Sequence, residues 1–272
     1  MGFLLIFSMF SVLFPGQGSQ SVGMIKDLFM NFKYVKDLFE QADETLKLSL
    51  TKIIFEGPKE KLDQTENTQP AIFLTSYSIF NVVKNETSFD LNKAAFFAGH
   101  SLGEYSALAC SNALNFVETI KLLKLRGRAM QNAVPKNQGG MVAVLGEETN
   151  KIVEVIKNNE NNFNCFLAND NCNGQVVISG KMDDLNKFVN ELKKLNIKNI
   201  KLPVSAPFHC SLMKPATEIM KKKIIDTKFL KPKNNIVSNV TAEANNDENK
   251  IKKLLIEQIE KPVLWRESIL YM

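Results

Sequence analysis

The sequence predicts an α/β protein in which a compact six-element unit interrupts a larger core. Short apolar segments at 9–14 and 94–98 end in glycine-containing turns, which is typical of buried strands. Longer segments repeat apolar residues with a helical period. Segments with strand and helix patterns follow one another in the order βαββαβ over 141–204. A length of 272 residues fits one large domain or two small ones.

The first half of the chain supplies the beginning of the core. Residues 9–14 predict a first buried strand, and 94–98 predict a second. Apolar residues recur at helical spacing on both sides of the turn at Gly57-Pro58. The predicted helices span 24–48, 68–84, a stretch from the second strand to about 110, and 115–131.

A composition break at 135–140 precedes the inserted unit. Its predicted strands and helices span 141–145, 148–158, 163–168, 174–179, 182–196 and 198–204. The order βαββαβ is that of a ferredoxin-like unit. We therefore predict a core formed by 1–136 and 206–272 and a ferredoxin-like subdomain at 137–205. A Lys-rich region at 214–261, with a strand pattern at 235–240, completes the core.

Charge and composition exclude several classes of protein. The net charge is +5, but only three basic residues are arginines, whereas nucleic-acid readers favour Arg. Four cysteines form no CxxC pair and there are two histidines, which argues against a zinc site or a disulfide framework. The apolar segment 3–14 is too short to span a bilayer. We expect no bound metal, no nucleic acid and no membrane.

The segment 99–103 reads GHSLG and matches G-x-S-x-G, the pattern of a nucleophile elbow. Its glycines allow a sharp turn from strand to helix that exposes the serine hydroxyl. The helix that follows presents free N–H groups and the positive end of its dipole. The sequence therefore predicts Ser101 as a nucleophile, and the alternative is a surface turn that contains glycine and serine.

A serine of ordinary pKa needs a base. The side chain of His100, next to the serine, is expected to point elsewhere, so His209 in the segment Ala206-Pro207-Phe208-His209 is the predicted base. No acid stands out between Ser101 and His209 as the third member of a triad. A Ser–His pair oriented by a backbone carbonyl therefore fits better than an ordinary hydrolase triad.

Two further features point to acyl chemistry or have a structural explanation. The glycine-rich loop at 14–20 lacks the Lys of a P-loop, and it either directs a backbone N–H at a developing oxyanion or is a tight turn. Arg126 lies on the apolar face of the helix at 115–131, where a guanidinium needs a partner. The periodicity leaves open whether that partner is a structural carboxylate or the carboxylate of a substrate.

Seven segments, in order, resemble the malonyl-CoA:acyl carrier protein transacylase family of fatty acid synthesis. They are FPGQGSQSVGM at 14–24, NTQPAIF at 67–73, GHSLGEYSAL at 99–108, RGRAMQ at 126–131, APFHCSLMKPA at 206–216, SNVTAE at 238–243 and KPVLW at 261–265. The resemblance implies an α/β-hydrolase-like core with a parallel sheet and a ferredoxin-like subdomain. It spans nearly the whole chain.

By this resemblance, Ser101 takes malonyl from malonyl-CoA and passes it to the pantetheine thiol of acyl carrier protein in a ping-pong reaction. His209 would activate Ser101 and then the thiol. Backbone N–H groups of Gln17 and Leu102 would form the oxyanion hole, and Arg126 would bind the malonyl carboxylate. The supporting residues would be Gln258, whose backbone carbonyl orients the histidine, Asn239 and Gln69.

The same resemblance predicts a monomer with no bound cofactor, and an acidic carrier protein that docks on Lys-rich surface such as 221–223 and 252–253. Family members continue for some tens of residues past the segment matching 265–272, with a final strand and helix, so we expect stability or full activity to depend on such a segment. Eight residues, apolar except for Ser8, precede the first strand. With the Asn and Lys bias they indicate a plastid or other organelle of a eukaryote, the alternative being the cytoplasm.

Two other functions remain open from the sequence. A serine thioesterase or esterase would use the same Ser101 and His209 but would release acid to water and would not need a buried Arg126. A carrier-binding scaffold without turnover is the third hypothesis, and the intact Ser101, His209 and Arg126 argue against it.

Overall fold

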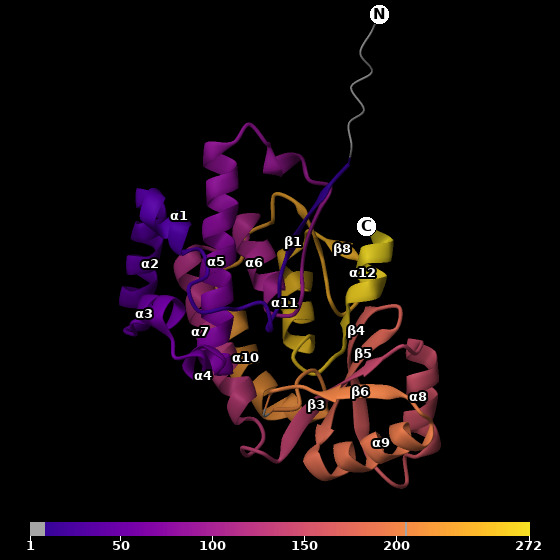
Figure 1. The fold of residues 1–272 in the computed structure, drawn as a ribbon. Coiled ribbons are helices and arrows are strands. Elements are labelled where there is room, and N and C mark those ends of the chain that lie inside the picture. The colour runs from indigo at the N-terminus through magenta and orange to yellow at the C-terminus, as the bar shows by residue number, and fades with distance from the viewer. Residues whose placement is uncertain (1–8, 205) are drawn as a thin grey trace, which may run out of the picture.

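The computed structural model describes residues 9–204 and 206–272. The predicted targeting function of the first eight residues lies outside these ranges. Figure 1 shows a larger helical part that surrounds a short sheet, with a smaller sheet and its two helices beside it. The mixed α/β architecture that the sequence predicts is confirmed.

The sheet of the larger part is built from short apolar strands. Its order is β1-β2-β7-β8, in which β1, β2 and β7 run parallel and β8 is antiparallel to β7. These strands are β1 (Ser11–Phe14), β2 (Phe96–Gly99), β7 (Asn235–Val237) and β8 (Ala244–Asn245). The central strands carry buried residues such as Phe97, Ala98 and Ile236. The carboxyl end of β2 therefore lies inside the molecule, where it can deliver the chain to a protected site.

Helices make up the rest of the larger part and pack on this sheet or on one another. They are α1 (Lys26–Asn31), α2 (Lys33–Leu46), α3 (Leu50–Glu56), α4 (Lys59–Leu62), α5 (Thr65–Glu86), α6 (Gly103–Cys110), α7 (Phe116–Asn132), α10 (Lys214–Asp226), α11 (Glu248–Glu257) and α12 (Trp265–Tyr271), with 3-10 turns at Leu91–Lys93 and Ser211–Met213. All eight residues of α6 are buried. The helical pattern over 24–48 corresponds to two helices, because Phe32 has extended backbone angles and separates α1 from α2.

The smaller sheet has the order β6-β3-β5-β4-β9. Its members are β3 (Gly139–Leu145), β4 (Cys165–Cys172), β5 (Gln175–Lys181), β6 (Lys198–Lys201) and β9 (Val263–Leu264), with α8 (Thr149–Asn158) and α9 (Met182–Lys194) between them. The four strands of the βαββαβ run are antiparallel to their neighbours in that run, in the spatial order fourth, first, third, second. This is the ferredoxin-like arrangement that the sequence predicts.

The smaller sheet separates two apolar clusters. Val142, Val144 and Ile178 on one face pack with residues of α8 and α9 into a core of their own. Met141 and Val177 on the other face belong to the main core. The alternation of side chains along each strand explains this division, since successive residues point to opposite faces. One face of the smaller sheet is therefore available to line a site shared with the larger part.

The segment 263–266 ties the two parts together. The strand β9 pairs parallel with β4, although the sequence prediction assigns 206–272 to the core. Arg266 then forms an ion pair with the buried Asp170 of β4, at 2.9 Å between Nη2 and Oδ2. The rings of His100 and Trp265 meet edge to face at 5.5 Å between centroids. The predicted domain boundaries at 137 and 205 stay a prediction. The pairing of β9 with β4 means that the chain returns to the smaller sheet after residue 205, which those boundaries do not include.

Gly127 gives the first testable prediction. A Cβ at this position of α7 would lie 2.4 Å from the backbone oxygen of Thr65 on α5. Although alanine favours a helix by about 1 kcal/mol over glycine, we expect Gly127→Ala to destabilise the protein by about 1–3 kcal/mol because the two helices must move apart. Chemical denaturation measures this, with the exposed Lys121→Ala on the same helix as control. An unchanged or higher stability of Gly127→Ala would contradict the close approach.

Candidate active site

The turn after β2 holds Ser101 in a left-handed conformation, with φ of 53°. A Cβ on Gly99 would lie 1.9 Å from the carbonyl carbon of Gly103, so the chain can fold back on itself only with glycine there. Left-handed backbone is uncommon for a non-glycine residue and carries strain. Strand β2, this turn and helix α6 therefore form the strand–turn–helix context that a nucleophile elbow requires.

Ser101 and His209 lie in direct contact. Ser101 Oγ is 2.8 Å from His209 Nε2, and His209 Nδ1 is 2.8 Å from the backbone oxygen of Gln258. A carbonyl oxygen can only accept, so Nδ1 carries the proton and donates it to Gln258. Nε2 is then left with a lone pair that accepts the hydroxyl proton of Ser101. This is the geometry of a general base, with a carbonyl where a triad has an acid.

Burial keeps the base uncharged. His209 is 4% exposed. Desolvation first, and the positive charge of Arg126 second, lower the pKa of His209 to about 3, against an opposing hydrogen bond to the Gln258 carbonyl. The imidazole is therefore neutral, and able to accept a proton, well below the pH at which an ordinary histidine titrates.

The low pKa of His209 gives a second prediction. The neutral imidazole is the active form, and its pKa is depressed. We therefore expect the rate at which an uncharged fluorophosphonate labels Ser101 to stay nearly constant from pH 8 to pH 5. The rate is measured by stopping the labelling reaction at set times and determining the labelled fraction by protein mass spectrometry. The reaction of the reagent with free serine is the control for its own pH dependence. A rate that halves near pH 6.5 would show that His209 titrates as an exposed histidine does.

Arg126 is 1% exposed and lies beside the nucleophile. Its Nη2 donates to Ser101 Oγ at 3.1 Å and to Gln258 Oε1 at 2.9 Å, and its Nη1 donates to Gln69 Oε1 at 3.0 Å. Among the described residues, no carboxylate forms an ion pair with this guanidinium. Of the two partners that the sequence leaves open for Arg126, a structural carboxylate in direct contact is therefore not found in these residues.

Amide side chains hold this arrangement from behind. Asn239 Oδ1 accepts the N–H of Ser101 at 2.6 Å, and Asn239 Nδ2 donates to Gly99 O at 2.8 Å. Gln258 Nε2 donates to Ser101 O at 3.1 Å. The turn that carries the nucleophile is thus fixed on both of its sides by side chains that follow it by more than a hundred residues.

A cavity of about 160 Å³ opens above Ser101. Six of the predicted site residues line it: Gln17, Gln69, Ser101, Leu102, Arg126 and His209. The other two predicted residues, Gln258 and Asn239, lie behind these and act on them through hydrogen bonds. The smaller sheet closes the far side with Met141, Asn169, Asn171 and Val177. The structure therefore brings all eight predicted residues to one site between the two parts.

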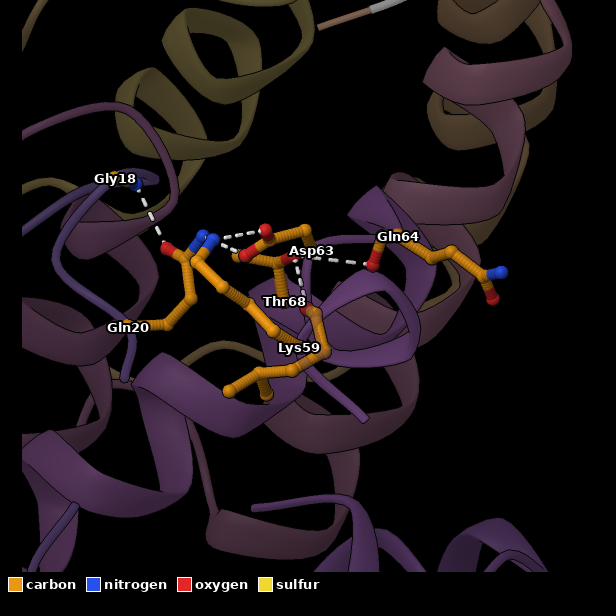
Figure 2. Close-up of polar contacts among 7 residues, drawn as sticks. Gly18, Gln20, Lys59, Asp63, Gln64 and Thr68 are labelled. Carbon is orange, nitrogen blue, oxygen red and sulfur yellow. Dashed lines mark hydrogen bonds and ion pairs between the residues drawn. The ribbon is translucent and has the colours of Figure 1, made fainter. Parts of the chain in front are cut away.

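Polar contacts of Gly18 and Gln20 restrain the loop that carries Gln17 (Figure 2). Gln20 accepts the N–H of Gly18 on Oε1 at 2.8 Å and donates through Nε2 to Asp63 Oδ1 at 2.8 Å. Lys59 forms an ion pair with the same Asp63. The loop is thus fastened to the junction of α4 and α5, which gives the backbone beside Gln17 a set position on the cavity wall.

The sequence prediction assigned no role to four polar side chains at the site, which are His100, Asn169, Asn171 and Glu104. His100 Nε2 lies 2.9 Å from Asn171 Oδ1 and 3.5 Å from Asn169 Nδ2, both on β4. The strand predicted at 163–168 ends too early because these polar residues interrupt its apolar pattern, and they do so because they face the cavity. Glu104, three residues after the nucleophile, is buried behind the site. The position of an acidic residue in the first helical turn after the nucleophile elbow could have identified Glu104 from the sequence.

Over 9–204 and 206–272, no cluster of three or more His, Cys, Asp or Glu side chains could hold a metal ion. No helix in those ranges combines the length and the apolar character needed to cross a membrane.

Comparison with known proteins places the chain in a family. A family model described as "Acyl transferase domain" matches residues 11–272. The malonyl CoA-acyl carrier protein transacylase of Bacillus subtilis (strain 168) is 42% identical over 266 residues, which cover 96% of this chain and 82% of that protein.

Solved structures agree. The malonyl CoA-acyl carrier protein transacylase of Coxiella burnetii matches with a TM-score of 0.92 and 37% identity, over 97% of this chain and 83% of that one. A malonyl-transacylase solved in complex with its type II polyketide acyl-carrier protein matches with a TM-score of 0.92 and 35% identity, over 97% and 85%. The chain therefore belongs to the malonyl-CoA:acyl carrier protein transacylase family of acyl transferases.

Proposed function

We propose that this chain transfers the malonyl group of malonyl-CoA to the phosphopantetheine thiol of acyl carrier protein, through a malonyl ester on Ser101. One observation carries the choice of acyl group. The guanidinium of Arg126 lies 3.1 Å from the nucleophilic oxygen and lines the same cavity, with amides rather than a carboxylate as its partners. A short acyl chain that ends in a carboxylate would place an anion in direct contact with this guanidinium, which can hold it with two hydrogen bonds.

The first half-reaction forms the ester. Ser101 Oγ attacks the thioester carbonyl while its proton moves to His209 Nε2, and the carbonyl oxygen becomes an oxyanion that the backbone N–H groups of Gln17 and Leu102 stabilise. The Gln258 carbonyl, which accepts from Nδ1, stabilises the imidazolium. The C–S bond then breaks, and the departing thiolate takes the proton from Nε2, so that neutral CoA leaves and His209 is neutral again.

The second half-reaction reverses these roles. The pantetheine thiol of the carrier gives its proton to His209 Nε2 and its sulfur attacks the malonyl ester. When the C–O bond breaks, Ser101 Oγ takes the proton back from Nε2. Proton and charge balance in each half, and no bound cofactor takes part. The malonyl carboxylate stays on Arg126 throughout, which keeps the reacting carbonyl beside both catalytic groups.

The carrier protein is expected to dock on lysines. The cluster Lys221-Lys222-Lys223 lies on α10 and Lys252-Lys253 lies on α11, and these helices pack on each other. Lys252 donates to the backbone oxygen of Ile225 at the end of α10, which brings the two clusters together. A positive surface of this kind attracts an acidic partner. We propose a monomeric enzyme that presents this surface to the carrier.

Intact-protein mass spectrometry after brief mixing with malonyl-CoA tests the function. We expect the mass to rise by one malonyl group, and the adduct to disappear, with equal gain on the carrier, when holo acyl carrier protein is added. Release of CoA with no adduct would instead show the serine thioesterase or esterase that shares the Ser–His pair. Carrier binding without an adduct or CoA release would indicate a scaffold.

A further inference from the structure

Glu104 is a buried carboxylate that the two half-reactions do not use. It lies in the first turn of α6, three residues after the nucleophile, and is 1% exposed. A carboxylate is costly to bury unless partners compensate it. Its partners therefore indicate what it does.

Both hydrogen bonds of Glu104 reach residues that position the catalytic pair. Glu104 Oε2 accepts the backbone N–H of Asn239 at 3.0 Å and the side-chain Nε2 of Gln258 at 2.8 Å. Asn239 in turn accepts the N–H of Ser101, and the carbonyl of Gln258 accepts from His209. One carboxylate thus holds the two residues that hold the nucleophile and the base.

The Gln258 amide also links Glu104 to Arg126. Its Nε2 donates to the carboxylate while its Oε1 accepts from Arg126 Nη2 at 2.9 Å. The amide therefore connects a buried anion to a buried cation. Arg126 opposes the effect of burial on Glu104, so the two charges stabilise each other without touching.

Few other charges face this carboxylate. The strands β1, β2 and β7 carry no charged residue. On α5, Glu66 forms an ion pair with Lys124 of α7 at 3.1 Å. The other charged residues of α5, Lys84 and Glu86, are exposed near the C-terminal end of the helix. The remaining titratable neighbours are His209, which is neutral, and Tyr105 on α6 itself, whose pKa burial raises to about 12. Arg126 is thus the one charged partner of Glu104 among the described residues that line this interior.

A malonyl carboxylate on Arg126 would change the charge balance. Two anions would then share one buried cation, and two like charges in one site favour protonation of one of them. Burial already raises the pKa of Glu104 to about 7, against the lowering effects of Asn239, Gln258 and Arg126. Glu104 is therefore the group that can take a proton from solvent near neutral pH.

We propose that Glu104 is a positioning residue that gives Arg126 its resting counter-charge, and that it takes up one proton when a malonyl carboxylate occupies Arg126. This rests on the proposed function, since it needs an acyl group with a free carboxylate. Protonated Glu104 keeps a lone pair for Asn239 and Gln258, so the position of the catalytic pair is maintained while the charge of the site returns to balance.

The test compares malonyl with acetyl, which lacks the carboxylate. Protein mass spectrometry measures the equilibrium constant for acyl transfer from each CoA ester to the enzyme between pH 6 and pH 9. In the ratio of the two constants, the titration of the CoA thiol cancels. For the wild type we expect the malonyl-to-acetyl ratio to fall above pH 7, approaching about tenfold per pH unit, because uptake of one proton has that linkage.

Two substitutions separate charge from positioning. Glu104→Gln keeps an acceptor for Asn239 and Gln258 but has no charge, so its malonyl-to-acetyl ratio should be independent of pH and exceed that of the wild type at pH 9. Glu104→Ala loses the acceptor, and we expect its turnover with both acyl groups to fall by about 10- to 100-fold because the pair is misplaced. Turnover should be partly restored in Glu104→Gln. The exposed Glu160→Gln is the matched control and should follow the wild type.

The proposed proton uptake would be overturned if the malonyl-to-acetyl ratio of Glu104→Gln fell with pH as in the wild type. It would also be overturned if the ratio of the wild type did not change with pH. Wild-type turnover in Glu104→Ala would overturn the positioning role. If Glu104→Ala does not fold, the slope of Glu104→Gln still decides. Failure of the wild type to form any malonyl ester is a separate result, which would remove the proposed function itself.

Discussion

Ser101→Ala is expected to abolish the malonyl ester and to lower transfer to the carrier by at least about 10⁴-fold. The reason is that both half-reactions pass through the Ser101 oxygen, and the imidazole 2.8 Å away has no other hydroxyl within reach of its Nε2 among the contacts of the described residues. Transfer is measured by the appearance of malonyl-carrier, and ester formation by protein mass after malonyl-CoA is added.

Ser88→Ala is the matched control, since Ser88 is exposed in a bend between α5 and β2. It should form the ester as the wild type does. Thermal unfolding should show that Ser101→Ala is folded, because alanine fits the space that the serine leaves. A mass increment on Ser101→Ala would place the ester on another residue and would contradict the proposed mechanism.

Arg126→Ala is expected to lower kcat/KM for malonyl transfer by about 10²- to 10⁴-fold and to remove the preference for malonyl over acetyl. Two hydrogen bonds from a guanidinium to a carboxylate contribute about 1.5–3 kcal/mol each, and each 1.4 kcal/mol changes the rate constant tenfold. Arg126→Lys keeps the charge but loses the planar fork, so we expect it to recover only part of the preference.

Arg128→Ala is the control for Arg126. It lies two residues further along α7 and is exposed, so it should retain the wild-type ratio of malonyl to acetyl. A hydrolase would be indifferent to Arg126→Ala, because water as acceptor needs no bound carboxylate. An unchanged acyl preference in Arg126→Ala would therefore count against the transacylase and in favour of the alternative.

Local pattern was enough for the elements that have a complete apolar periodicity. The helix predicted at 115–131 is α7 (Phe116–Asn132), and the βαββαβ order predicts the smaller sheet. Pattern failed where a single backbone angle decides, as at Phe32 between α1 and α2. It also failed at β9, since a strand of two residues is defined by its partner β4 and not by its own sequence.

For the site, the elbow at Ser101 and the base His209 could be identified from residue type and order. The role of Glu104 could not be identified in this way, because the sequence does not show which residues an acidic side chain in a helix contacts. Its partner Gln258 follows it by 154 residues and comes from the end of another helix. Resemblance to relatives assigned Gln258 a role through its backbone carbonyl, but its side chain also forms hydrogen bonds with Arg126, Ser101 and Glu104.

The separation along the chain of the groups that hold Ser101 has a consequence for folding. The nucleophile meets His209, Asn239 and Gln258 at sequence separations of 108, 138 and 157 residues. Contacts of this range must close long loops and form late compared with local helices. During synthesis, the turn at Ser101 leaves the ribosome well before the residues that restrain it. The reactive serine is therefore completed by tertiary contacts that form late in folding. A partly synthesised chain contains the GHSLG motif but lacks the residues that make Ser101 reactive.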